Sequence, residues 1–263
     1  MWHSEGYVVM SNLVDDVFDE AHRAMSTFFP PEHKGTPDFG GVSFPTCTAL
    51  DKITLHPNIL SFARRCLGDI MLTQSEAWCK GEWGENADQR MHMDFGNHCF
   101  TKPAPWPTPE VIACIVYFDD TRETGGATAL VPYQSALYPP DAWTRMPGIN
   151  YPFANNRYEA EKLMGVHKAF RQRLYDAEVK IQAKPGDVLF YRHDLWHRGT
   201  PVKPGKTRRV MNIAFKKTEA HHIYTWCQGF ARKNYYGHVE AVIRELNDSQ
   251  RSALGIPMGR CRL

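Results

Sequence analysis

Apolar positions in the first quarter of the chain recur at helical spacing. A short apolar strand is predicted from Gly6 to Met10, and an amphipathic helix follows from Ser11 until Pro30 and Pro31 stop it. The apolar positions of this helix are Val14, Val17, Phe18, Ala21, Met25 and Phe28. Residues 32–48 are rich in Gly, Pro and Thr and predict a loop. A second helix is predicted from Pro57, which suits the first helical position, to the residue before Gly68.

Beyond this helix the pattern changes to short apolar runs typical of strands. The predicted strands are Ile70 to Trp78, Gln89 to Phe95, Val111 to Phe118, Ala127 to Val131, Val179 to Gln182, Val188 to Tyr191 and Val210 to Lys216. Helices at one end of a strand-rich chain indicate an α+β fold with a mainly β core, in which a sheet is closed or folded on itself and braced by helices. The chain shows no internal repeat or domain linker, so a single domain over residues 1–263 is expected.

Two long insertions interrupt the strands. Residues 99–109 carry four prolines and Trp106, and residues 138–178 begin with prolines and continue as a polar, basic segment that predicts a helix. Insertions of this length in compact domains often serve as lids over a site, so we expect these two on the substrate side. A solvated surface with a charged face is the alternative interpretation.

Composition narrows the class of protein. The chain has 263 residues, and 31 Lys and Arg against 29 Asp and Glu argue against a dedicated nucleic-acid binder. The longest apolar run, Val111 to Phe118, is too short to cross a bilayer, so no membrane association is expected. Seven irregularly spaced cysteines without a CxxC pair, and a start without a signal peptide, predict a reduced, cytoplasmic protein. The final Cys261-Arg262-Leu263 resembles a peroxisomal address, which is the alternative for a eukaryotic source.

A candidate metal site is built from His92, Asp94 and His197. Residues two apart in a strand share a face, so His92 and Asp94 can bind one metal, and a third ligand must come from a distant strand. Two imidazoles and one carboxylate leave open positions, as in non-haem Fe(II) oxygenases. Arg208, eleven residues after His197, can fix an anionic co-substrate one strand away. His193 competes with His197 for the ligand role, but Arg209 fits the anchor spacing from His193 poorly.

The combination HMD, then GDVLFYRHDLWHRG, then the arginine resembles the phytanoyl-CoA dioxygenase family of Fe(II)/2-oxoglutarate oxygenases. The opening EGYVVM and the segments LHPNILSFARRCLGD and DDTRETGGATALVPYQS agree with it. The resemblance implies a double-stranded β-helix, a jelly-roll barrel of cupin type, braced by N-terminal and C-terminal helices. It also implies iron ligands at His92, Asp94 and His197, and a salt bridge from Arg208 to 2-oxoglutarate. Gln74 and Thr128 are further expected contacts of the co-substrate.

The resemblance implies an oxidoreductase, a dioxygenase that uses Fe(II), 2-oxoglutarate and O2, with ascorbate as a stimulant, and releases succinate and CO2. Because Asp94 is present where related halogenases have Gly or Ala, the expected reaction is hydroxylation of a small organic substrate. Desaturation, epoxidation and ring rearrangement are the alternative outcomes of the same chemistry. Gly199 departs from the family, because many members have a serine two residues after the distal histidine. The substrate and the oligomeric state are not readable from the sequence.

Two other classes of protein remain open. A zinc-dependent hydrolase can use a His/Asp/His set with an activated water, but it has no use for Arg208 at the metal. A non-catalytic barrel that binds a small molecule is the second alternative, because the fold does not fix the function.

Overall fold

The computed structural model describes residues 2–30, 32–33, 41–81, 88–94, 105–139, 168–220 and 245–255. Its strands form two antiparallel sheets. The larger sheet has the order β1 (Tyr7–Met10), β7 (Val188–Arg192), β4 (Val111–Tyr117), β9 (Arg208–Lys217), β3 (Ile70–Lys80) and β2 (Val42–Ser43). The smaller sheet has the order β6 (Val179–Lys180), β5 (Thr128–Leu130) and β8 (His197–Gly199).

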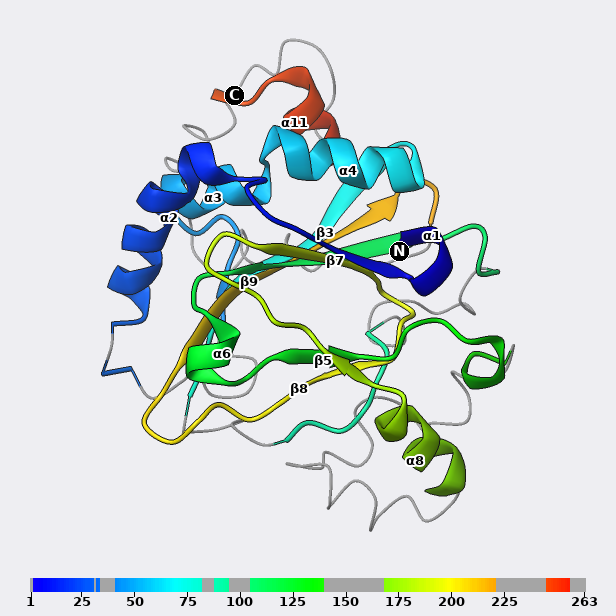
Figure 1. The fold of residues 1–263 in the computed structure, drawn as a ribbon. Helices are drawn as coiled ribbons and strands as arrows, with labels where there is room; N and C mark the ends of the chain where they lie inside the picture. The colour runs from blue at the N-terminus through cyan, green and yellow to red at the C-terminus, as the bar shows by residue number, and fades with distance from the viewer. Residues whose placement is uncertain are drawn as a thin grey trace.

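Helices and the smaller sheet lie on opposite faces of the larger sheet (Figure 1). One face is covered by α2 (Asp15–Phe28), α3 (Thr48–Thr54), α4 (Pro57–Leu67) and α11 (Asp248–Ala253). The other face looks toward β5 and β8. The short elements are α1 (Trp2–Glu5), α6 (Thr121–Thr124) and the 3₁₀ helix η1 (Ser135–Leu137), and α8 (Lys168–Asp176) lies beyond the smaller sheet.

Strand β4 shows why the sequence has an uninterrupted apolar run. All seven of its residues are buried, and the six from Ile112 to Tyr117 alternate between two apolar clusters. Ile112, Cys114 and Val116 belong to the cluster under the helices, whereas Ala113, Ile115 and Tyr117 belong to the cluster between the sheets. A strand buried on both faces needs apolar side chains at every position, so the polar alternation of a surface strand is absent.

The mainly β core with bracing helices confirms the predicted fold class. The described strands form two facing sheets and do not close into a barrel. The predicted strand Gln89 to Phe95 is wrong over its described residues, 89–94, where only an isolated bridge at His92 occurs. The predicted loop 32–48 contains β2, and α3 follows it, a helix that the pattern did not predict. The first long helix begins at Asp15 rather than Ser11.

Within these ranges, no helix combines the length and the apolar character needed to span a bilayer. The predicted insertions are described only in part, over residues 105–109, 138–139 and 168–178. Of the basic segment, residues 168–176 form α8, as predicted. The C-terminal Cys261-Arg262-Leu263 lies outside the described residues.

Candidate metal centre

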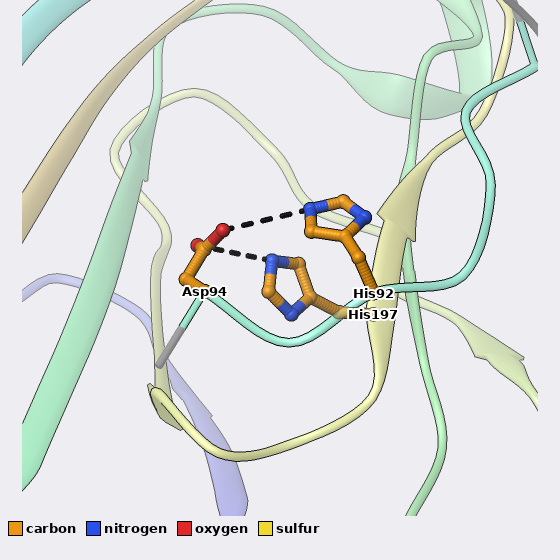
Figure 2. Close-up of side chains that lie close together, drawn as sticks. All are labelled: His92, Asp94 and His197. Atoms are coloured by element: carbon orange, nitrogen blue, oxygen red, sulfur yellow. Dashed lines mark ion pairs between the residues drawn. The ribbon is translucent and has the colours of Figure 1, made fainter. Parts of the chain in front are cut away.

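Three side chains from two distant parts of the chain meet at one point. His92, Asp94 and His197 each offer a ligand atom, and these atoms all lie within 4.8 Å of one another. The Asp94 carboxylate is 3.6 Å from His92 Nε2 and 3.1 Å from His197 Nε2. Figure 2 shows the carboxylate facing both imidazole rings, with an ion pair drawn to each. His197 is buried, and the other two are partly exposed.

Backbone hydrogen bonds hold the two histidines opposite each other. His92 N–H donates to the His197 carbonyl at 2.9 Å, and His197 N–H donates to the His92 carbonyl at 2.8 Å. Each ring also has its Nδ1 at 2.9 Å from a backbone carbonyl, that of Arg90 for His92 and that of Leu195 for His197. A carbonyl only accepts, so each Nδ1 carries a proton, and Nε2 is the ring nitrogen left to bind a metal once it carries no proton. Both histidines are therefore prepared to bind a metal through Nε2.

Side-chain contacts fix the segment that carries His92 and Asp94. Gln89 N–H donates to the Gly199 carbonyl at 3.1 Å, and Gly199 N–H donates to Gln89 Oε1 at 2.8 Å. Arg198, the neighbour of His197, forms a bidentate pair with Glu178, 2.7 Å for each bond, and also binds Asp88. These contacts tie both ends of residues 88–92 to β8. The two ligand-bearing segments therefore form one unit although neither is part of a long strand.

The charges of the three groups are coupled. Burial, and then the neighbouring His197, lower the pKa of His92 to about 4. Burial alone would raise the pKa of Asp94, but the attraction to His197 and His92 lowers it well below its usual value. Burial would lower the pKa of His197, and the Asp94 carboxylate raises it instead. The set therefore combines an ionised carboxylate with a neutral imidazole and an imidazole paired to that carboxylate.

Arg208 lies between the two sheets at the start of β9. It is buried, and burial lowers the pKa of its guanidinium. It forms no ion pair with any carboxylate of the described ranges, and its Nε is buried without a hydrogen-bond partner there. Tyr117 is close enough to raise the Arg208 pKa, and the Tyr117 hydroxyl donates to Thr128 Oγ1 at 2.8 Å. Thr128 and Tyr117 thus lie on the side of the site where Arg208 is.

Gln74 does not lie near Arg208. It stands opposite Ala214 in the register of β3 and β9, whereas Arg208 stands opposite Lys80. Six residues of strand separate the two positions, roughly 20 Å at about 3.3 Å per residue. The Gln74 amide instead donates to Glu76 at 3.3 Å. One small co-substrate cannot contact both Gln74 and Arg208, so the expected Gln74 contact has no support in this geometry.

The sequence profile of the phytanoyl-CoA dioxygenase family matches residues 2–210. The chain belongs to this family. By class it is therefore an Fe(II)/2-oxoglutarate-dependent oxidoreductase, as the sequence predicted. A comparison with curated protein sequences finds no significant match.

Solved structures share the fold at low sequence identity. The α-ketoglutarate-dependent epimerase SnoN from nogalamycin biosynthesis is 14% identical with a TM-score of 0.58, over 85% of this chain and 83% of SnoN. The carbocyclase SnoK from the same biosynthesis is 13% identical with a TM-score of 0.52, over 84% and 83%. HygX from Streptomyces hygroscopicus, with nickel and 2-oxoglutarate bound, is 14% identical with a TM-score of 0.54, over 83% and 85%.

The glycine at position 199 has a local explanation. A Cβ atom built there would lie 2.8 Å from Gln89 Oε1 and 3.2 Å from Lys80 Nζ. The space that a serine would need is therefore taken by Gln89, whose side chain binds the Gly199 backbone. In this family member the position serves to hold the ligand-bearing segment.

Sequence reasoning missed two residues of the site and set a third aside. Tyr191 packs edge-on against His197, with ring centroids 5.0 Å apart, and burial and then Asp94 raise its pKa well above the usual value. His193 was weighed only as a competing ligand, but its Nε2 is 3.8 Å from Asp94 Oδ2. Tyr117 and Tyr191 sit in the apolar runs of two predicted strands, and the sequence pattern assigned neither of them a role. The alternation of side chains along a strand could have placed both tyrosines on the face between the two sheets.

Of the first expected lid, the structure describes residues 105–109, which include Trp106. Its ring stacks on Tyr133 at 3.7 Å between centroids, and the Arg192 guanidinium lies 3.9 Å from its ring centre. Its Nε1 donates to the His3 carbonyl at 3.2 Å. Trp106 is therefore anchored among described neighbours.

Proposed function

We propose that this protein is an Fe(II)- and 2-oxoglutarate-dependent oxygenase that hydroxylates a small organic substrate. His92 and His197 would hold iron through Nε2, and Asp94 through its carboxylate. The observation that carries this assignment is the convergence of the three ligand atoms within 4.8 Å, on histidines whose Nδ1 atoms are already bound to carbonyls. When bound, iron with 2-oxoglutarate and O2 supplies the oxidation and yields succinate and CO2.

The residues of the chain would position the co-substrate. Arg208 presents a buried guanidinium without a carboxylate partner in the described ranges, which suits the far carboxylate of 2-oxoglutarate. Thr128 and Tyr117, joined by a hydrogen bond, would line the same end. Burial of Arg208 and Thr128 between the sheets would exclude water from this end of the site. Gln74 is left out of this assignment because it lies too far along β3.

The class of substrate is proposed from two kinds of support. One structure of SnoN holds Fe3+, α-ketoglutarate and nogalamycin RO, and one structure of HygX holds nickel, 2-oxoglutarate and hygromycin B. Both ligands are small molecules, and the near balance of charges in this chain agrees with a small-molecule substrate. Residues 1–263 would form one oxygenase domain, with 99–109 and 138–178 on the substrate side. Epimerase and carbocyclase relatives show that the same fold supports outcomes other than hydroxylation.

The test is succinate production from 2-oxoglutarate without added substrate, under air, with Fe(II) and ascorbate. The wild type is compared with Asp94→Ala and with His3→Ala, an exposed histidine that serves as the control. Slow iron-dependent turnover in the wild type and His3→Ala, lost in Asp94→Ala and under nitrogen, supports the proposal. If the wild type neither forms succinate nor binds 2-oxoglutarate by calorimetry, the oxygenase proposal is wrong. Oxygen-independent hydrolysis with zinc would then favour the hydrolase.

A further inference from the structure

A second buried arginine, Arg171, has no hydrogen-bond or ion-pair partner among the residues that the structure describes. Arg171 on α8 is 1% exposed, and its Nε, Nη1 and Nη2 atoms are all buried. None of these three nitrogens has a hydrogen-bond partner, and no ion pair joins Arg171 to a carboxylate of the described ranges. A guanidinium carries five N–H donors and stays charged at any ordinary pH. A buried charge in this state is costly unless something pairs with it.

The other buried arginines show how this fold normally treats such a group. Arg192 forms a bidentate pair with Asp194, with bonds of 2.8 and 2.7 Å. Arg198 pairs with Glu178 and Asp88. Only Arg208 shares with Arg171 the lack of a carboxylate partner in the ranges described, and Arg208 is the residue that we assign to an anionic ligand. The same signature at Arg171 points to a second anion.

The position of α8 separates this residue from the metal ligands. Phe170, Arg171, Leu174 and Tyr175 form the buried face of the helix. This face packs on Met91, Met93 and Trp196, and the Met91 N–H donates to the Tyr175 hydroxyl at 3.1 Å. Buried Met91 and Met93 alternate with partly exposed His92 and Asp94. The helix therefore lies on the side of this segment that the metal ligands do not face.

We propose that Arg171 is the recognition residue of an anion site on α8, distinct from the metal centre. The ligand is a group with two or more equivalent oxygens, a carboxylate or a phosphate, because such a group accepts two parallel hydrogen bonds from one guanidinium. The group is either a free anion or the charged end of a larger organic molecule. The proposal does not depend on the oxygenase assignment.

Inorganic phosphate is the probe, and the change in melting temperature of the metal-free protein is the readout. The measurement uses the Arg208→Met background, so that the other unpaired guanidinium is absent. Phosphate at tens of millimolar is expected to raise the melting temperature by about 2–4 °C. Adding Arg171→Met abolishes the rise. Adding Arg173→Met keeps it, because Arg173 is an exposed arginine of the same helix that donates to the Ala136 carbonyl.

The stability of the wild type and of Arg171→Met without added anion is a second, independent measurement. If the Arg171 guanidinium has no partner, Arg171→Met is at least as stable to urea as the wild type. A loss of stability, or a phosphate response that survives Arg171→Met, overturns the proposal. Acetate in place of phosphate distinguishes the two chemistries, since the stronger response identifies the group that the site accepts. Failure of the Arg208 assignment would appear separately, as unchanged binding of 2-oxoglutarate in Arg208→Met.

Discussion

The two ends of the site differ in how their charges are satisfied before any ligand binds. At the metal end, the Asp94 carboxylate lies 3.1 Å from His197 and 3.6 Å from His92, and both imidazoles donate from Nδ1 to backbone carbonyls. At the anchor end, the buried guanidinium of Arg208 has no carboxylate partner in the described ranges. The metal end can therefore fold empty at little cost, whereas the anchor end keeps an uncompensated charge.

This difference indicates at which end the bound ligand stabilises the protein more. A metal that binds at His92, Asp94 and His197 has to displace an existing ion pair, so part of its binding free energy is spent there. An anion at Arg208 displaces no protein carboxylate and relieves a buried charge. Four changes test this comparison.

Loss of a ligand at the metal end should have the largest effect. We expect His197→Ala to reduce Fe(II) affinity by more than about 100-fold, because removing an outer partner of a ligand alone costs about 10–100-fold. Anaerobic calorimetry with Fe(II) measures this, with His3→Ala as the control. Wild-type affinity in His197→Ala would remove this residue from the site, and His193→Ala would then be the variant to compare.

Replacing Arg208 should weaken the binding of 2-oxoglutarate without weakening the binding of the metal. Arg208→Met should weaken 2-oxoglutarate binding by at least about 100-fold, since two charge-assisted hydrogen bonds of about 1.5–3 kcal/mol each are lost. Fe(II) affinity should stay within about twofold of the wild type, because the ion pairs of His92, Asp94 and His197 do not involve Arg208. Titration with 2-oxoglutarate in the presence of a redox-inert metal gives the first value. Equal losses for metal and co-substrate would contradict the separation.

A paired arginine should behave differently from the unpaired one. Arg198→Met leaves Glu178 and Asp88 without their cation and should destabilise the protein by about 3 kcal/mol. Arg208→Met should cause no such loss in the ligand-free protein. Urea denaturation of both variants makes the comparison. Similar destabilisation of the two would show that Arg208 is already satisfied in the empty protein.

The smallest effect is expected in the pH dependence of stability, through the ion pair between Asp94 and His197 in the metal-free protein. The pKa of Asp94 is lowered, so its stabilising effect is present above about pH 4 and is lost as the pH falls through the folded pKa. The pKa of His197 is raised, so its effect is present below about pH 6.5 and is lost as the pH rises through the folded pKa. Asp94→Asn should therefore destabilise the metal-free protein more at pH 5.5 than at pH 8.5. Urea denaturation with a chelator at both pH values measures this, and an equal loss would contradict the pairing.

The elements that local pattern determines were predictable from the sequence. The helix at Asp15–Phe28 and the strand at Val111–Tyr117 have strong periodicity or a continuous apolar run, and both predictions hold. His92, Asp94 and His197 were selected by motif, and the structure brings them together. Arg208 follows at the expected spacing, and it is buried between the sheets as an anchor has to be.

The failures fall where tertiary contacts decide the conformation. Residues 88–94 have the alternation of a strand, but they are held by Arg198, Gly199 and Tyr175 rather than by a neighbouring ladder. Gln74 was selected by its place before His92, and only the register of β3 with β9 shows its distance from Arg208. Tyr117 and Tyr191 carry polar ends in apolar runs, and their role becomes visible only when the two sheets face each other.

The bridge between His92 and His197 has a consequence for the order of folding. The two residues are far apart in the chain, so closing the loop between them costs conformational entropy that only the packed sheets can compensate. The three proposed ligands therefore come together only once β8 has docked on the segment that carries His92. The rate of metal capture during refolding would report the docking of β8 on the segment that carries His92.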